Sequence, residues 1–180
     1  AWVQAQMALP ASRYSDGGDD RVHIKSDGFI CDDPGAPVQC WRDYYAAEQI
    51  DALAQAIYQA ENGGALIIGD QTGVGKGRVV AGLMKYAVHN DRVPVFFTKD
   101  PTLYNAMLDD LQDVGAGEVV PLITNTAFDK EYQDFKGRLK EAGIPYGKEH
   151  FEQFNETRQL PKGVNAIFTS YSQISADDAP

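Results

Sequence analysis

The sequence predicts an α/β fold with a mostly parallel sheet, and three observations lead to this prediction. Short apolar runs alternate along the chain with amphipathic stretches of helical period, the order that builds parallel strands joined by helices. A glycine-rich loop stands between one apolar run and the helical stretch that follows it. The 180 residues are 43% hydrophobic and 23% charged, which is enough apolar material for one globular core.

The first 45 residues lack a sustained period. Serine, aspartate, glycine and proline gather at residues 15–20 and 31–37, a composition typical of turns and loops. The pattern becomes regular from Ala46 onward. We therefore expect an irregular lead-in over residues 1–45 and one α/β domain, incomplete at its carboxyl end, over residues 46–180.

The regular part begins with a helix, a strand and a second helix. Apolar residues recur at helical spacing between positions 50 and 58, and the Asn-Gly-Gly at 62–64 predicts the end of this helix. The apolar run 65–68 is bounded by glycine and predicts a buried strand. Apolar residues at helical spacing over 79–87 predict the next helix.

Strands and helices continue to alternate in the second half of the chain. A buried strand is predicted at 94–98, and further strands are predicted at 119–123 and 164–169. Helices are predicted at 103–111, after an Asp-Pro entry that suits a helix start, and near 130–142. The polar stretch after Pro145 receives no assignment.

Charge and composition exclude several classes of protein. The net charge of −10 argues against a chain that binds nucleic acid tightly by itself, because phosphate neutralisation needs clustered Lys and Arg. No apolar run approaches the roughly 20 residues that span a bilayer, so we expect no membrane partner. Cys31 and Cys40 fit no zinc spacing and the three histidines are scattered, so no metal-ligating residue is predicted.

The segment 69–78, Gly-Asp-Gln-Thr-Gly-Val-Gly-Lys-Gly-Arg, has the setting of a phosphate-binding loop, with an apolar run before it and a helix after it. Glycines let the backbone approach a phosphate, and the helix that follows presents its positive end to the same anion. Lys76 would reach the β- and γ-phosphates, and it is the residue to which we assign a catalytic role. Nucleotide contacts are predicted for Asp70, Gln71, Thr72, Gly73, Val74, Gly75, Lys76, Gly77 and Arg78.

The loop departs from the common pattern at two positions. Asp70 stands where many such loops have glycine, and Gly77 stands where serine or threonine gives a hydroxyl to Mg²⁺. The missing hydroxyl implies that the metal is held by water or by groups elsewhere, with Thr72 as one candidate. Arg78 either forms a salt bridge on the loop helix or faces the phosphates. The alternative for the whole segment is a glycine-rich turn with a chance lysine.

The loop resembles that of strawberry notch-like proteins, a branch of the superfamily-two helicase-like ATPases, whose loop also reads G-K-G-R. The resemblance extends over about 46–176 and is nearest to phage and bacterial versions. Three further segments carry it, namely 47–53 (AEQIDAL), 109–116 (DDLQDVGA) and 162–172 (KGVNAIFTSYS).

The resemblance implies part of a RecA-like first lobe of a nucleic-acid-dependent ATPase over residues 46–180. Its ligands would be ATP and Mg²⁺, and its partners a second lobe and nucleic acid, DNA more than RNA, in the cytoplasm of a bacterial or phage-infected cell. Gln49 would stand where helicases with an upstream glutamine motif read adenine. The alternative is a polar residue on an exposed helix face.

The resemblance also places three threonines where helicases contact nucleic acid. Thr98, Thr102 and Thr169 follow or end predicted strands, and their hydroxyls would bond phosphates. The alternative is strand-end packing and helix capping. No Lys or Arg lies between Lys99 and Lys130, so contacts in this stretch would be weakly electrostatic.

The acidic motif that would hold Mg²⁺ and orient the attacking water is expected beyond residue 180. We therefore expect the parent protein to hydrolyse ATP and this chain alone to show weak hydrolysis or none. Two alternatives remain: a P-loop phosphotransferase such as a small-molecule kinase, and a non-catalytic P-loop binding or packaging module.

Overall fold

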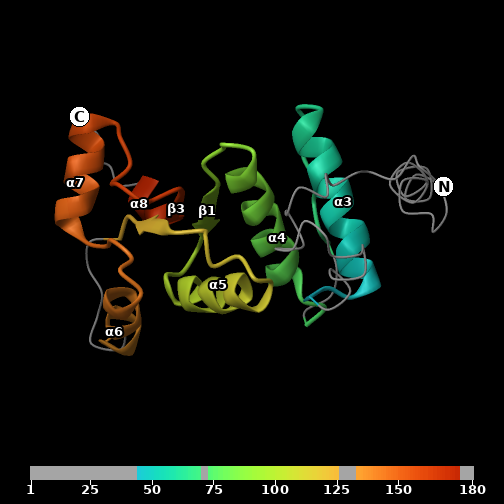
Figure 1. Ribbon diagram of the computed structural model, residues 1–180, viewed down its shortest axis with the longest axis horizontal. Coiled ribbons are helices and arrows are strands. Elements are labelled where there is room, and N and C mark those ends of the chain that lie inside the picture. The colour runs from blue at the N-terminus through green and yellow to red at the C-terminus, as the bar shows by residue number, and fades with distance from the viewer. Residues whose placement is uncertain (1–43, 70–72, 126–132, 175–180) are drawn as a thin grey trace. The chain divides into compact units, whose positions relative to one another are not determined.

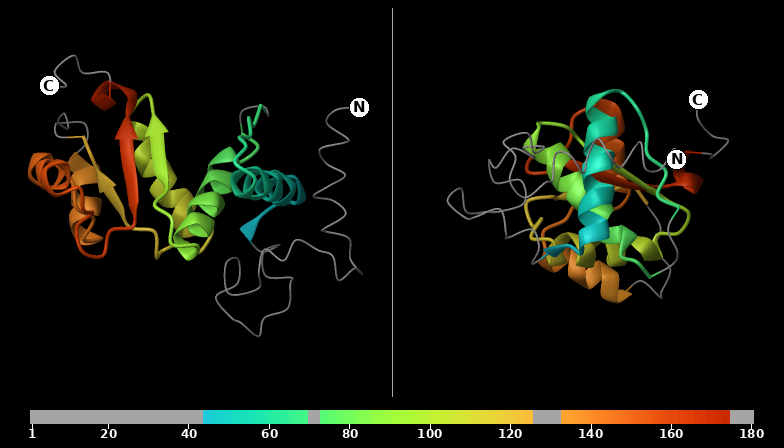
Figure 2. Two further views of the ribbon diagram at one scale, coloured as in Figure 1. Left: turned by 90° about the horizontal axis from the view of Figure 1, so that it is seen from above. Right: turned by 90° about the vertical axis from the view of Figure 1, so that its right-hand side faces the viewer.

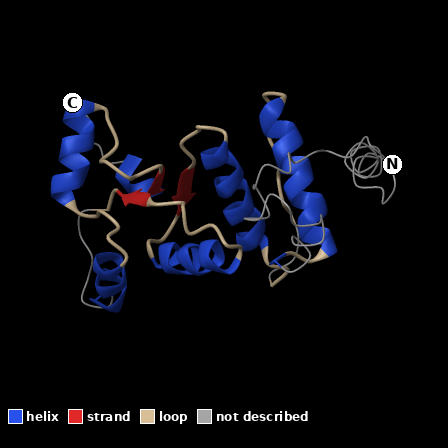
Figure 3. Ribbon diagram, viewed as in Figure 1, coloured by secondary structure: helices blue, strands red, loops and turns tan. Residues whose placement is uncertain are grey.

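The computed structural model describes residues 44–69, 73–125 and 133–174 (Figure 1). None of the helices in these residues combines the length and the apolar character needed to cross a membrane. The elements are α3 (Ala47–Glu61), α4 (Lys76–His89), β1 (Val95–Thr98), α5 (Thr102–Asp113), β2 (Pro121–Ile123), α6 (Gln133–Glu141), α7 (Lys148–Thr157), β3 (Ala166–Ser170) and α8 (Tyr171–Ile174). This order of helices and strands confirms the α/β class (Figure 3).

The three strands form one parallel sheet in the order β1-β3-β2. Val95 of β1 and Leu122 of β2 both lie opposite Ile167, so β3 is the central strand. The left view of Figure 2 shows the three arrows side by side, pointing the same way. The parallel sheet predicted from the alternation of strands and helices is therefore confirmed.

The chain divides into two compact units, residues 1–86 with 110–116, and residues 87–109 with 117–180. The core of the first unit contains the buried side chains of Leu53, Ile57, Val79, Ala81, Met84, Val114 and Ala116. The core of the second surrounds the sheet and contains the fully buried side chains of Tyr104, Leu122, Ile123, Leu139 and Phe168. The expected division at residue 45 stays a prediction, and residues 1–43 lie outside the described residues.

Aromatic rings and a polar network join α5 to the sheet in the second unit. The ring of Phe168 lies edge-on to that of Phe96, with centroids 5.1 Å apart, and 5.6 Å from that of Tyr104. The Tyr104 hydroxyl donates to Oδ1 of Asn125 at 2.6 Å, and Nδ2 of Asn125 donates to Oγ of Ser170 at 3.1 Å. Burial raises the pKa of the Tyr104 hydroxyl above its usual range, so it remains a donor.

The strand predicted at 65–68 is not formed. Residues 64–69 belong to no helix or strand, and Ile67 is 93% exposed. A parallel strand gains its hydrogen bonds only from a neighbouring strand, and the described residues of the first unit contain none. The prediction of a buried strand at 94–98 is correct in its position but wrong in its burial, because Val95 and Phe97 are about half exposed on an edge strand.

Helix α7 was not assigned from the sequence. Its ten residues carry no buried side chain, so no apolar stripe marks it. Its start follows Gly147, whose φ of 91° lies in the left-handed region. The helix ends at Arg158, which is also left-handed and donates its backbone N–H to the carbonyl of Phe154. Backbone turns therefore set the limits of this helix where the apolar pattern gives no signal.

Candidate functional site

The described part of the glycine-rich loop has a backbone that depends on glycine at two positions. Gly73 and Gly75 have backbone φ angles of 95° and 74°, which residues other than glycine rarely adopt. No atom lies within 4 Å of a Cβ built at Gly73, so the backbone there is open to a ligand. Helix α4 starts at Lys76, directly after the loop. Asp70, Gln71 and Thr72 lie outside the described residues.

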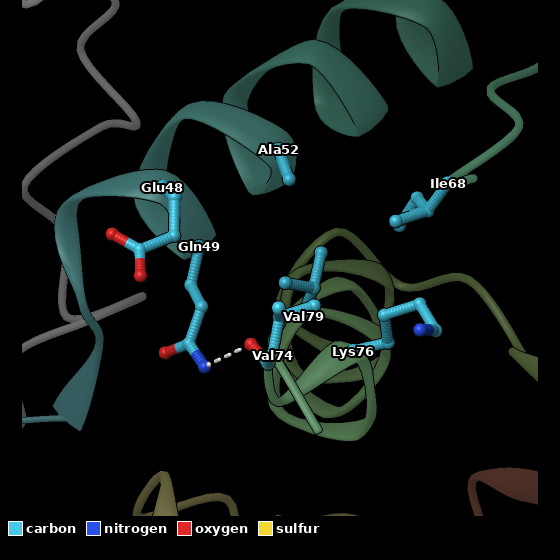
Figure 4. Close-up of a pocket in the computed structure, with 7 residues that line it drawn as sticks. All are labelled: Glu48, Gln49, Ala52, Ile68, Val74, Lys76 and Val79. Carbon is cyan, nitrogen blue, oxygen red and sulfur yellow. Dashed lines mark hydrogen bonds between the residues drawn. The ribbon is translucent and has the colours of Figure 1, made fainter. Parts of the chain in front are cut away.

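Gln49 joins the first turn of α3 to the loop. Its side-chain nitrogen Nε2 donates to the carbonyl oxygen of Val74 at 3.0 Å and to that of Gly75 at 3.4 Å (Figure 4). Its oxygen Oε1 accepts a hydrogen bond from the backbone N–H of Ala46, which begins the helix. The side chain is buried, and both the nitrogen and the oxygen of its amide form hydrogen bonds within the protein.

Gly75 is required for a second reason besides its backbone conformation. A Cβ at this position would collide with Nε2 of Gln49. Any larger residue would therefore displace the amide that holds the loop. The contact links two of the segments on which the resemblance rests, one around Gln49 and one around Lys76.

Lys76 and Gln49 lie on different sides of the first turn of α4 (Figure 4). The side chain of Lys76 extends on the side where Ile68 lies. A small pocket beside them is lined by Glu48, Gln49, Ala52, Ile68, Val74, Lys76 and Val79. The pocket has about 10 Å³ of free space, room for roughly one water molecule, so a base would enter only if its walls moved.

The loop helix α4 also contacts the end of α5 through an ion pair. Nη2 of Arg78 lies 2.9 Å from Oδ2 of Asp113, and Nη1 donates to the carbonyl of Tyr44 at 3.3 Å. Both charged side chains are about half exposed, so the pair adds at most about 1 kcal/mol of stability. Arg78 thus forms a salt bridge, with a partner on α5, and its contact with phosphates stays a prediction.

Asp110 packs against Gly77 one helical turn before Asp113. A Cβ at Gly77 would come within 2.8 Å of Cγ and 3.2 Å of Oδ1 of Asp110, and closer still to Oδ2. Sequence reasoning did not select Asp110. Two features of the sequence could have pointed to Asp110. Gly77 lacks the hydroxyl expected after the loop lysine, and Asp110 belongs to the segment 109–116, one of those on which the resemblance rests.

Lys85 fixes the end of α5 in the same unit. Its side chain is 1% exposed, and Nζ donates to the carbonyl oxygen of Gly115 at 2.9 Å. A positive charge is favoured at a helix C-terminus, where carbonyl groups have no partner within the helix. The bond therefore holds residues 110–116 beside α4.

The three threonines predicted at strand ends lie at or after the carboxyl ends of β1 and β3. Thr98 and Thr169 are buried, at 4% and 6% exposed. The hydroxyl of Thr98 bonds the backbone of Asp100, and the hydroxyl of Thr169 accepts from Thr124 at 2.8 Å. Thr102 is exposed, and its backbone N–H donates to Oδ1 of Asp100 at 2.9 Å. Their contact with nucleic acid stays a prediction.

An exposed pair of aromatic rings lies beside these threonines. The rings of Phe97 and Tyr171 are stacked, with centroids 6.4 Å apart and planes 18° apart. Phe97 is 45% and Tyr171 60% exposed. Exposed aromatic faces of this kind can stack on the bases of a single strand.

No group of three or more His, Cys, Asp or Glu side chains in the described ranges could hold a metal ion by itself. Phosphate oxygens are the usual partners of Mg²⁺ in nucleotide sites.

Comparison with known proteins gives one match. The family described as P-loop containing NTP hydrolase pore-1 matches residues 43–179, which covers both the loop and the strand-end threonines. No curated protein and no solved structure shows a significant similarity to the chain.

Proposed function

The chain belongs to the P-loop containing NTP hydrolase pore-1 family, and from this premise we propose that its 69–78 loop binds the phosphates of ATP. We assign the chain to the first RecA-like lobe of a strawberry notch-type helicase ATPase. The observation that carries the proposal is the passage from two left-handed glycines, Gly73 and Gly75, directly into α4 at Lys76.

Each part of the loop has a separate task in this proposal. Backbone N–H groups at the glycines and at the start of α4 would donate hydrogen bonds to the phosphate oxygens, because a helix N-terminus attracts anions. The ammonium group of Lys76 adds a point charge for the β- and γ-phosphates. The bound Mg²⁺ would neutralise the developing charge on the phosphates. This chain's contribution to catalysis is then positioning and charge neutralisation.

Gln49 has two candidate tasks at this site. The resemblance to glutamine-motif helicases would give it contact with adenine, while its Nε2 bonds to Val74 and Gly75 support a task in holding the loop. The second task, holding the loop, is favoured, because the amide is buried and its oxygen and nitrogen already form hydrogen bonds within the protein.

We extend the proposal to nucleic acid, with DNA as the first candidate. Support comes from the exposed, stacked rings of Phe97 and Tyr171 and from the exposed Thr102 at the start of α5. These groups lie at the carboxyl side of a parallel sheet, the edge where α/β proteins usually place their ligands.

The proposal is tested by titrating the protein with ATP in the presence of Mg²⁺, for the wild type and for Lys76→Ala. A hydrogen bond to a charged group contributes about 1.5–3 kcal/mol, so we expect the variant to bind ATP at least about tenfold more weakly. Lys148→Ala is the matched control, because that lysine is 74% exposed and lies outside the loop. Equal affinity in Lys76→Ala and wild type, with circular dichroism unchanged, would show that the loop does not bind phosphate.

A further inference from the structure

We propose that Asp110 provides the carboxylate oxygen for the nucleotide's Mg²⁺ that residue 77 of the loop does not provide. The inference deepens the proposed function and rests on it, because the metal would arrive with ATP. In this inference the end of α5 both packs against α4 and supplies a ligand to the nucleotide's Mg²⁺.

The first step concerns position 77. In common phosphate loops the residue after the lysine is serine or threonine, and its hydroxyl is a ligand of Mg²⁺. Gly77 has no side chain, so the loop itself leaves that oxygen missing. Mg²⁺ requires oxygen ligands in near-octahedral geometry, so another oxygen must take this place.

The second step is that the carboxylate of Asp110 fills the space of the missing side chain. Oδ2 lies nearer to a Cβ built at Gly77 than Cγ does at 2.8 Å. A serine hydroxyl would lie one bond from that Cβ, so the carboxylate oxygen occupies the region that such a hydroxyl would use. A residue larger than glycine at position 77 would therefore require the carboxylate of Asp110 to move.

The third step is that neighbouring contacts hold the end of α5 that carries Asp110 beside α4. Asp113, one turn further along α5, is paired with Arg78 of the loop helix at 2.9 Å. Leu111 is buried at 3% exposed, and Lys85 bonds the carbonyl of Gly115 just after the helix. A carboxylate on a packed helix keeps its position better than one on a mobile loop, which suits a metal ligand.

The chemistry gives this role a signature in nucleotide binding. A carboxylate beside the phosphates attracts ATP when Mg²⁺ lies between them, since Mg²⁺ is bound by one or two carboxylates together with phosphate oxygens. Without a divalent cation the same carboxylate repels the phosphates, because like charges at short range raise the energy. Removing the charge of Asp110 should therefore change the two affinities in opposite directions.

The experiment compares ATP affinity in excess Mg²⁺ and in EDTA for the wild type and Asp110→Asn. We expect the variant to bind ATP about tenfold more weakly in Mg²⁺ and severalfold more tightly in EDTA. Asp109→Asn is the matched control, because it removes the same charge from the neighbouring, exposed residue that pairs with Arg138. The control should keep the wild-type ratio of the two affinities.

A second variant pair tests the exchange between positions 77 and 110. Asp110→Ala removes the carboxylate and the collision, and adding Gly77→Ser to it restores an oxygen from the loop. We expect the double variant to regain most of the Mg²⁺-dependent affinity that Asp110→Ala loses. No gain in the double variant, with both proteins folded by circular dichroism, would contradict the exchange.

The outcomes separate this inference from the proposed function. If the wild type binds no ATP in either buffer, the proposed function fails together with the inference. If the wild type binds ATP and Lys76→Ala does not, but Asp110→Asn changes both affinities by the same factor, the function stands and Asp110 has only a structural role. A gain in affinity in both buffers would mean that the carboxylate occupies the phosphate position and competes with ATP.

Discussion

Gln49 connects two segments that lie far apart in the sequence. Its Oε1 accepts from the N–H of Ala46 at the start of α3, and its Nε2 donates to the loop carbonyls of Val74 and Gly75. Because the side chain is buried, water could not replace a lost hydrogen bond, and the loss of either bond would leave a polar group unsatisfied. A single substitution can therefore distinguish its two candidate tasks.

We predict that Gln49→Glu binds ATP and GTP more weakly by the same factor, about five- to thirtyfold, since a lost buried hydrogen bond costs about 1–2 kcal/mol. The glutamate keeps an acceptor for Ala46 but places negative charge against the two loop carbonyls. The measurement is the affinity for both nucleotides at one Mg²⁺ concentration. Weakened binding of ATP alone would assign Gln49 to adenine, as the resemblance implies.

At the scale of elements, the close approach of α3 and α4 depends on a glycine. A Cβ at Gly82 of α4 would lie 2.6 Å from the Tyr45 hydroxyl and 3.0 Å from Cδ2 of Leu53 of α3. Both neighbours are buried, at 5% and 1% exposed. Burial also raises the pKa of Tyr45 above its usual range, more than Arg78 lowers it.

We predict that Gly82→Ala lowers the free energy of unfolding by about 1–2 kcal/mol, because overpacking costs more than the gain in helix propensity. Gly137→Ala is the matched control on α6. No atom lies within 4 Å of a Cβ there, so alanine should stabilise by up to about 1 kcal/mol. Thermal unfolding of both variants measures the difference. Stabilisation by Gly82→Ala of the same size would show that α3 and α4 have room to separate.

At the scale of the whole molecule, the net charge of −10 limits how the protein can hold nucleic acid. Affinity for phosphates grows with the number of lysines and arginines that displace counterions. No Lys or Arg occurs from residue 100 to residue 129, which includes α5 and β2. Stacking on the pair formed by Phe97 and Tyr171 is then the main attraction available in this region.

We predict weak binding of a single-stranded DNA oligonucleotide, with an affinity that changes little with salt. Tyr171→Ala should lower this affinity about tenfold, since stacking one base on an aromatic ring contributes about 1–3 kcal/mol. The control is Tyr58→Ala, on α3 in the other unit. Fluorescence anisotropy at 50 and 200 mM salt measures both effects, and a steep fall in affinity with salt would point to a basic surface instead.

The sequence alone determined the fold class and most elements. Helices α3, α4 and α5 and all three strands of the sheet were predicted near their positions, because each carries an apolar pattern of its own period. It also located the loop and indicated its P-loop family, since the glycines at 73 and 75 are required by the backbone conformation and the lysine at 76 follows the pattern of such loops. These are local requirements, and local requirements are visible in a sequence.

Only the tertiary structure decided which side chains meet at the loop. Gln49, Lys76 and Asp110 are separated by tens of residues, and no periodicity predicts that Asp110 fills the space left at Gly77. The same limit explains the error at 65–68, where an apolar run has no strand to pair with, and the omission of α7, which buries no side chain. Pairing, packing and the partners of buried polar groups depend on contacts between distant segments, and these contacts form only when the chain folds.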